Sequence, residues 1–85
     1  MPFYVYLVEC SDGTYYCGYT KNLKERIHDH NHTKNGAWYT RHRRPVKLVY
    51  GEEFETKKSA MSREYEIKHF TRRDKENLAA YYKAQ

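Results

Sequence analysis

Residues 3–20 read FYVYLVECSDGTYYCGYT, which is two aromatic and β-branched runs joined by a short polar segment. The first run, residues 3–9, alternates and is rich in Val and Tyr, and residues 15–20 are again aromatic or small. Such residues favour β-strands, whereas the Ser, Asp, Gly and Thr of residues 11–14 favour a tight turn. The segment therefore predicts a β-hairpin.

The residues after the hairpin have the signature of a helix start. Asn22 is a suitable N-cap, and Glu25 lies three positions later, as in a capping box. Leu23 and Ile27 are four residues apart and so share one helix face. We expect a helix over about residues 22–32.

A loop and a third strand should follow that helix. Residues 33–44 contain Gly36 and mixed polar residues without a period, and Pro45 comes directly after them, so we expect a loop there. Apolar side chains alternate over residues 46–54, which predicts a strand.

Two further helices complete the predicted fold. Thr56 can cap the first, and Thr71 with Asp74 three residues later resembles a second capping box, so we expect a break near Phe70. The predicted order is ββαβαα. We expect residues 1–85 to form a single α/β domain of the α+β type, a three-stranded antiparallel sheet flanked by helices.

The composition sets broad limits on function. Sixteen Lys and Arg residues against eleven Asp and Glu residues give a net charge of +5 and a pI near 9.2. A basic surface favours polyanionic partners such as nucleic acid without identifying one. A mean hydropathy of −1.14 argues against a membrane span, and the first residues lack a signal-peptide pattern, so we expect a cytoplasmic protein.

Two aromatic triplets of the hairpin are the most specific motif. They are Tyr-Val-Tyr at residues 4–6 and Tyr-Cys-Gly at residues 16–18, and they are followed in order by Arg26, His30 and Glu64. This ordered set resembles the GIY-YIG nuclease superfamily, most closely its small single-domain bacterial branch, over nearly the whole chain. The resemblance implies a metal-dependent endonuclease.

The triplets also depart from the family pattern. Tyr4 stands where the family has Gly, and Val5 and Cys17 replace the usual Ile residues. A second family His has no clear match, although His42 approximates it.

Phosphodiester hydrolysis needs a deprotonated oxygen nucleophile and neutralisation of phosphoryl charge. The resemblance assigns water activation to Tyr16 and positioning of the proton network to Tyr6. Arg26 would stabilise the phosphoryl charge with its fork of donors, and His30 would move a proton near neutral pH. The alternative for both tyrosines is a half-buried aromatic pair on a hairpin.

Glu64 interrupts an otherwise apolar helix face, so its charge needs a partner. The resemblance makes Glu64 the protein ligand of one divalent cation, Mg²⁺ or Mn²⁺, which prefers oxygen ligands and keeps several waters. The alternative is an ion pair with Arg26 or Lys68.

The register of the hairpin decides whether these residues can share one site. A two-residue turn at residues 12–13 would pair Val8 with Cys17 and place Tyr6 and Tyr16 on opposite faces of the sheet. A shared site requires both tyrosines on one face.

We therefore expect a longer loop or a bulge near residues 13–15. The shift that we predict pairs Cys10 with Tyr16 and Val8 with Gly18.

Further residues are candidates for binding and support. Gly18 would leave room for a substrate backbone or for a packed neighbour, and Asn77 lies near the position of a supporting Asn in the family. The basic part of the loop expected over residues 33–44 could bind a phosphate backbone and stack on bases, or it could simply be solvated. Its candidate residues are Arg41, Arg43, Arg44, Trp38 and Tyr39.

The resulting hypothesis is a metal-dependent endonuclease that acts on DNA in preference to RNA, without a membrane partner. Most superfamily members use an attached domain for target recognition, so targeting here would rest on the basic loop, on oligomerisation or on a protein partner. The alternatives are a non-catalytic nucleic-acid-binding module that retains the fold, and an interaction protein for an acidic partner.

Overall fold

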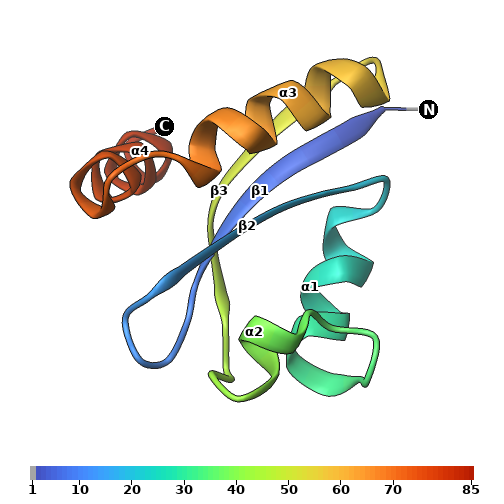
Figure 1. Cartoon of the computed structure of the whole chain (residues 1–85), viewed down its shortest axis with the longest axis vertical. Coiled ribbons are helices and arrows are strands. Elements are labelled where there is room, and N and C mark those ends of the chain that lie inside the picture. The colour runs from blue at the N-terminus through green and yellow to red at the C-terminus, as the bar shows by residue number, and fades with distance from the viewer. Residues whose placement is uncertain (1) are drawn as a thin grey trace.

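A computed structural model of the chain describes residues 2–85 and confirms the predicted α+β fold (Figure 1). Its elements are β1 (Phe3–Glu9), β2 (Tyr15–Thr20), α1 (Leu23–His32), α2 (Trp38–Arg41), β3 (Lys47–Phe54), α3 (Lys57–Lys68) and α4 (Arg72–Lys83). The predicted order ββαβαα is correct apart from α2, a four-residue helix in the segment for which we expected only a loop.

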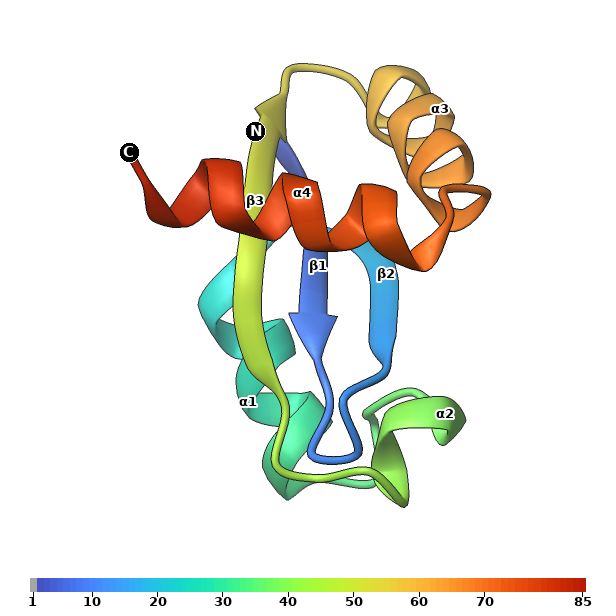
Figure 2. The same cartoon turned by 90° about the vertical axis from the view of Figure 1, so that its left-hand side faces the viewer.

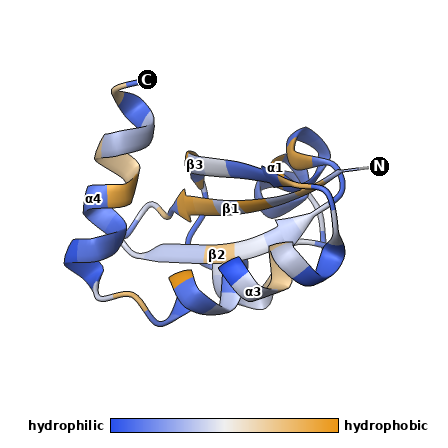
Figure 3. Ribbon diagram, turned by 90° about the horizontal axis from the view of Figure 1, so that it is seen from above, coloured by the Kyte–Doolittle hydropathy of each residue, from blue (hydrophilic) through white to orange (hydrophobic). Residues whose placement is uncertain are grey.

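The three strands form one antiparallel sheet in the order β2-β1-β3. The central strand, β1, is the most hydrophobic (Figure 3), because both of its faces are covered. Its four central residues, Val5 to Val8, are at most 1% exposed. Side chains therefore alternate between two separate cores on the two faces of the sheet.

Helices cover both faces of this sheet. Figure 2 shows α4 crossing in front of the strands, with α3 beside it and α1 and α2 behind them. Ala60 and Ile67 of α3 pack with Val5, Leu7 and Cys17 on the first face. The second face has its own core, which consists of Tyr6, Val8, Cys10 and Val46 with Tyr16, Leu23, Ile27, Tyr39 and Leu48 around it.

The predicted helix starts are confirmed. The Asn22 side chain accepts a hydrogen bond from the Glu25 amide at 3.0 Å, and the Thr56 hydroxyl accepts from the Ser59 amide at 3.1 Å. Thr71 forms the expected capping box with its partner three residues later. These caps satisfy amides that the helices themselves leave unpaired.

The hairpin loop has three residues, one more than the shortest turn. The Cys10 amide donates to the Thr14 carbonyl at 2.7 Å, and Gly13 adopts a positive φ of 84°, which a glycine adopts without strain. The longer loop that we expected is therefore present.

The exact pairs that we predicted are wrong, however. Val8 lies opposite Tyr16, and Tyr6 lies opposite Gly18. The register shifts in the opposite direction from our prediction, because the third loop residue is Ser11, on the side of the first strand, and not a residue on the side of the second strand. Both shifts have the same consequence, which is that the two tyrosines share one face.

None of the helices formed by residues 2–85 combines the length and the apolar composition that a bilayer span requires.

Candidate active site

Two tyrosines of the hairpin meet His30 on the face of the sheet that α1 covers. The Tyr6 Oη atom lies 2.7 Å from His30 Nε2. The rings of Tyr6 and Tyr16 contact the imidazole edge to face, with centroid separations of 5.6 and 5.4 Å. Three of the residues that we predicted to be catalytic are therefore in direct contact.

Arg26 completes this group from the preceding turn of α1. Its Nε atom lies 3.4 Å from Tyr6 Oη, and its Nη1 atom donates to the Asn35 carbonyl at 2.7 Å. The loop after α1 thus holds the guanidinium over the phenol. We call Tyr6, Tyr16, Arg26 and His30 the tyrosine cluster.

Gly18 makes room for the Tyr6 ring. A Cβ atom at Gly18 would lie 2.5 Å from Tyr6 Oη and 2.7 Å from Tyr6 Cζ, far inside van der Waals contact. Of the two roles considered for Gly18, the structure shows the packed neighbour. The ring crosses the neighbouring strand at Gly18 and so reaches His30.

His30 is completely buried and is bonded at both ring nitrogens. Its Nδ1 atom lies 2.8 Å from Thr40 Oγ1, and the Thr40 hydroxyl donates to the Ala37 carbonyl at 2.9 Å. Thr40 is also completely buried. A hydrogen-bonded chain therefore runs from Tyr6 through His30 to the backbone of the segment around α2.

Gly36 brings that segment against α1. A Cβ atom at Gly36 would lie 2.7 Å from the Asp29 carbonyl oxygen and 2.9 Å from His30 Cα, so the backbones touch where a side chain would separate them. This close approach is what carries Thr40 within reach of the imidazole.

Burial shifts the pKa values of the two bonded groups in opposite directions. Burial lowers the pKa of His30 to about 4, and the nearby charge of Arg26 adds to this effect. Burial raises the pKa of Tyr6 to about 12, against the opposing hydrogen bond and charge of Arg26. At neutral pH the pair therefore consists of a neutral phenol and a neutral imidazole.

Tyr39 and Arg43, two of the residues that we proposed for nucleic-acid binding, form one wall of the cluster. The Tyr39 ring stacks on Tyr16 with centroids 6.0 Å apart and an interplanar angle of 24°. The Arg43 guanidinium lies 4.0 Å from the Tyr39 centroid and forms an ion pair with Asp12 at 3.0 Å. The hairpin loop thus holds the aromatic stack in place.

The other residues of the proposed nucleic-acid surface differ in their surroundings. Arg44 donates to the Thr33 carbonyl, to the His30 carbonyl at 2.5 Å and to the Asp29 carbonyl at 3.3 Å, so its guanidinium caps the end of α1. Arg41 is exposed and donates to a loop carbonyl at 2.9 Å, and Trp38 is 70% exposed. Their binding of nucleic acid stays a prediction.

Glu64 lies on α3, the helix whose Ala60 and Ile67 pack on the other face of the sheet from the tyrosine cluster. Its carbonyl accepts a hydrogen bond from Cys17 Sγ at 3.9 Å, and the Cys17 side chain packs in the core beneath α3. Among residues 2–85, no hydrogen bond or ion pair joins Glu64 to the cluster. Its ionic partner is Lys68, with Nζ 3.8 Å from Oε1, which is one of the two pairs that we considered.

The surroundings of Glu64 fit a cation that is held mainly by water. The side chain is 17% exposed, and the Lys68 pair is at the outer limit of an ion pair. No group of three or more His, Cys, Asp or Glu side chains suited to a metal occurs within the described part of the chain. A single carboxylate suits Mg²⁺ or Mn²⁺, because these ions retain several waters.

Asn77 is exposed on α4, which packs on the face of the sheet opposite the tyrosine cluster. The structure therefore does not bring Asn77 to this cluster.

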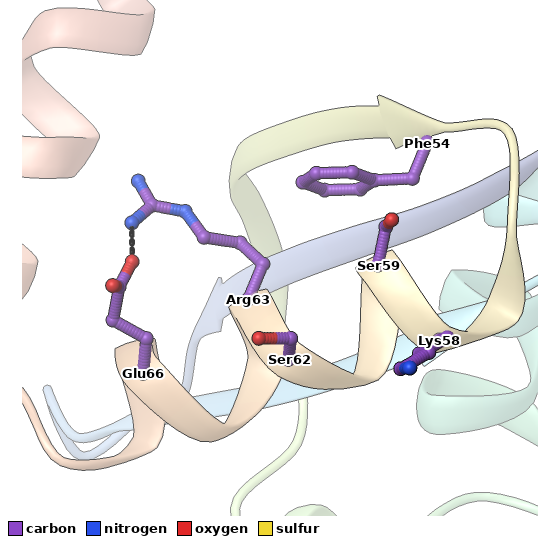
Figure 4. Close-up of a pocket in the computed structure, with 6 residues that line it drawn as sticks. All are labelled: Phe54, Lys58, Ser59, Ser62, Arg63 and Glu66. Carbon is purple, nitrogen blue, oxygen red and sulfur yellow. Dashed lines mark hydrogen bonds and ion pairs between the residues drawn. The ribbon is translucent and has the colours of Figure 1, made fainter.

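Two surface hollows bear on where a ligand could bind. One, of about 300 Å³, borders Arg26 at the start of α1 and is lined also by Lys21, Asn22 and Asp29. The other, of about 390 Å³, lies between α3 and the end of β3 (Figure 4). Its Arg63 is already paired with Glu66, and the tyrosine cluster takes no part in its lining.

Sequence reasoning missed Thr40 and the role of Gly36. Thr40 lies in a helix of only four residues, which is too short to show a period, and it contacts a residue ten positions away. We know of no local signal that would have identified it.

Comparison with known proteins identifies the family and finds solved structures of the same fold. The model of the GIY-YIG catalytic domain matches residues 2–77. A UPF0213 protein of Limosilactobacillus reuteri is 53% identical over 78 residues, which is 89% of this chain and 80% of that protein. One from Haloquadratum walsbyi is also 53% identical, over 89% of this chain and 84% of that protein.

Two solution NMR structures have the same fold. The UPF0213 protein of Bacillus halodurans has a TM-score of 0.60 at 47% identity, covering 95% of this chain and 85% of its own. A protein of E. faecalis has a TM-score of 0.65 at 37% identity, and the match covers 100% of this chain and 90% of that protein. The chain therefore belongs to the GIY-YIG family, whose catalytic domain spans nearly its full length.

Proposed function

We propose that the protein is a metal-dependent endonuclease that hydrolyses phosphodiester bonds in nucleic acid, with DNA preferred over RNA. The observation that carries the proposal is the contact of Tyr6 Oη with both His30 Nε2, at 2.7 Å, and Arg26 Nε, at 3.4 Å. A phenol with a proton acceptor on one side and a cation on the other is suited to proton transfer.

The contacts favour Tyr6 over Tyr16 for activating water. The Tyr6 proton has an acceptor in His30, whereas Tyr16 Oη has no hydrogen-bond partner among residues 2–85. We propose that Tyr6 takes a proton from the attacking water as it passes its own proton to His30. Because Tyr6 is 1% exposed in the free protein, this water must enter with the substrate. Transfer in one concerted step avoids a free phenolate, which the high pKa of Tyr6 disfavours.

Substrate binding should strengthen His30 as the acceptor. The positive charge of Arg26 is one of the causes that keep the pKa of His30 low. A phosphodiester beside Arg26 would offset that charge and raise the pKa of His30. Arg26 would then stabilise the charge that develops on the phosphoryl oxygens.

Tyr16 is half-buried, and Tyr39 stacks on its ring. We propose that its phenol orients the attacking water or a phosphate oxygen at the mouth of the site. Glu64 would hold the divalent cation, which when bound supplies Lewis-acid stabilisation of phosphoryl charge.

The proposed substrate class rests on the basic charge of the chain, and a cytoplasmic location and a protein partner are further parts of the proposal. The net charge of +5 suits a polyanion, and we place the protein in the cytoplasm, with a protein partner contributing to targeting.

Cleavage of supercoiled plasmid and of labelled DNA and RNA oligonucleotides, with and without Mg²⁺ or Mn²⁺, tests the proposal. We expect metal-dependent nicking of DNA that Glu64→Gln reduces strongly. Glu66→Gln is the matched control, because Glu66 lies on the same helix and pairs with Arg63. Cleavage that survives both Glu64→Gln and Tyr16→Phe would come from a contaminating nuclease and would contradict the proposal.

A second candidate function is nucleic-acid binding without catalysis. The ion pair of Glu64 with Lys68 favours it, because a cation of the chain already faces this carboxylate, which forms no hydrogen bond with the tyrosine cluster among residues 2–85. Salt-dependent binding of DNA, measured by fluorescence anisotropy, without cleavage in either metal would support this candidate.

A further inference from the structure

The buried hydrogen-bonded chain behind Tyr6 has an end that the proposed mechanism does not use. We propose that Thr40 is a positioning residue that holds His30 in the tautomer protonated at Nδ1, so that the Nε2 lone pair faces Tyr6. The catalytic consequence rests on the proposed nuclease function, but the tautomer itself does not.

The direction of the chain follows from the proton of the Thr40 hydroxyl. That hydroxyl lies 2.9 Å from the Ala37 carbonyl oxygen, which accepts only, and 2.8 Å from His30 Nδ1. If Thr40 donates to Ala37, its oxygen is left to accept, and His30 must carry its proton on Nδ1. His30 Nε2 is then unprotonated and accepts from Tyr6 at 2.7 Å.

The reverse direction leaves a buried proton without a partner. If Thr40 donated to Nδ1, His30 would carry its proton on Nε2 and would donate to Tyr6 Oη. Arg26 is a donor only, so the phenol would accept two hydrogen bonds and its own proton would have no acceptor among residues 2–85. Tyr6 is 1% exposed, so water cannot readily replace that acceptor.

In the first direction each donor has one acceptor. Arg26 donates to Tyr6, Tyr6 to His30, His30 to Thr40, and Thr40 to the Ala37 carbonyl. In this arrangement the lone pair of His30 Nε2 faces the Tyr6 hydroxyl, which must lose its proton in the proposed mechanism. The tautomer that satisfies the buried groups is therefore also the one that suits proton transfer from Tyr6.

The backbone around Thr40 holds its hydroxyl in place. The Thr40 amide donates to the Ala37 carbonyl at 3.1 Å, and the Arg43 amide donates to the Thr40 carbonyl at 2.9 Å. The side chain is completely buried. A fixed and buried hydroxyl can orient an imidazole in the way that a buried acceptor does in other general-base sites.

Imidazole ¹⁵N shifts, read from long-range ¹H–¹⁵N spectra of the labelled protein near pH 7, test the inference. For wild type we expect His30 to show a protonated Nδ1 and an unprotonated Nε2. Thr40→Val replaces the hydroxyl with a methyl group of similar size and removes the acceptor. Each tautomer then leaves one buried proton unpaired, so we expect the Nε2-protonated form to appear beside the Nδ1-protonated form. Thr40→Ser retains the hydroxyl and should retain the wild-type tautomer.

Two results would overturn the inference. One is a protonated Nε2 in wild type, a measurement that does not depend on whether any variant folds. The other is an unchanged tautomer in folded Thr40→Val, which would show that another group sets the protonation of His30.

Cleavage rates test the catalytic consequence separately. We expect Thr40→Val to reduce the single-turnover rate roughly 10²-fold, the low end of a general-base contribution, while Thr40→Ser keeps most of it. Full activity in a Thr40→Val protein whose spectra show the Nε2-protonated form would contradict the positioning role. If wild type cleaves nothing, the nuclease proposal fails, while the ¹⁵N shifts still decide the tautomer.

Discussion

At the scale of single residues, Tyr6 depends on two neighbours that have little chemistry of their own. Gly18 leaves the space that the phenol occupies, and Thr40 accepts a hydrogen bond behind the imidazole that the phenol contacts. Burial of the phenol raises its pKa to about 12, so its proton needs a specific acceptor. Small changes at Gly18 or Thr40 should therefore alter the position of the Tyr6 ring or the hydrogen bond of its hydroxyl.

Gly18→Ala should destabilise the fold and disturb the Tyr6 site. The added Cβ would lie 2.5 Å from Tyr6 Oη, so the ring must move. We expect the free energy of unfolding to fall by roughly 1–3 kcal/mol, the usual range for overpacking. Urea denaturation measures the loss.

Gly51→Ala is the matched control for this change. Gly51 is also in a strand, and a Cβ there would meet its nearest atom at 3.4 Å, an ordinary contact. Equal losses in the two variants would show that the Tyr6 ring is not what Gly18 accommodates.

The buried imidazole should make the fold sensitive to acid. The pKa of His30 is about 4 in the folded state against 6.5 for an unperturbed His, so the unfolded state binds more protons between these values. The contribution of neutral His30 to the free energy of unfolding is therefore fully present above pH 6.5. The free energy of unfolding falls as the pH drops toward 4, by up to roughly 1.4 kcal/mol per pH unit.

Denaturation curves at several pH values between 7 and 4 measure this dependence. His30→Gln cannot titrate and should show a shallower loss over the same window. Parallel losses in wild type and His30→Gln would mean that other groups cause the acid sensitivity.

At the scale of elements, the end of α1 and the segment after it act as one unit. Arg44 reaches back to three carbonyls at the C-terminus of α1, and Gly36 lies against the same helix. These contacts carry Thr40 and Tyr39 to the tyrosine cluster. An arginine that sequence alone placed on a nucleic-acid surface is thus a helix cap in the structure.

Arg44→Gln should lower stability by roughly 1–3 kcal/mol, because partly buried carbonyls lose charged donors. Arg41→Gln, at an exposed position with one loop contact, should change it by no more than about 0.5 kcal/mol. Thermal or urea unfolding distinguishes the two. If Arg44→Gln is as stable as wild type, the capping role is wrong.

Elements with strong local signals could be predicted from the sequence. Asn22, Thr56 and Thr71 marked the helix starts correctly, because a cap depends on residues only a few positions apart. The hairpin pairs could not be fixed, because they depend on which strand supplies the third loop residue, which in the structure is Ser11. The helix α2 was missed because four residues carry no period.

At the scale of the whole molecule, the predicted site residues come from the sheet and from helices that pack on different faces of it. Tyr6, Tyr16, Arg26 and His30 meet on the face that α1 covers, as their order and spacing indicated. Glu64 belongs to α3, the helix that covers the other face, and its carbonyl accepts a hydrogen bond from Cys17 of β2. Sequence spacing could identify Glu64 as a candidate ligand, but the face that a helix covers is a property of the folded chain.

The central claim is that Tyr6 and His30 form the proton-transfer pair of a nuclease. Single-turnover cleavage of DNA in Mg²⁺ or Mn²⁺ by Tyr6→Phe tests it most directly, with Tyr19→Phe as the control, since Tyr19 packs on the opposite face of the sheet. We expect Tyr6→Phe to lose roughly 10²-fold to 10⁴-fold in rate while DNA binding is kept, and Tyr19→Phe to remain active. A Tyr6→Phe protein that cleaves at the wild-type rate would contradict the account.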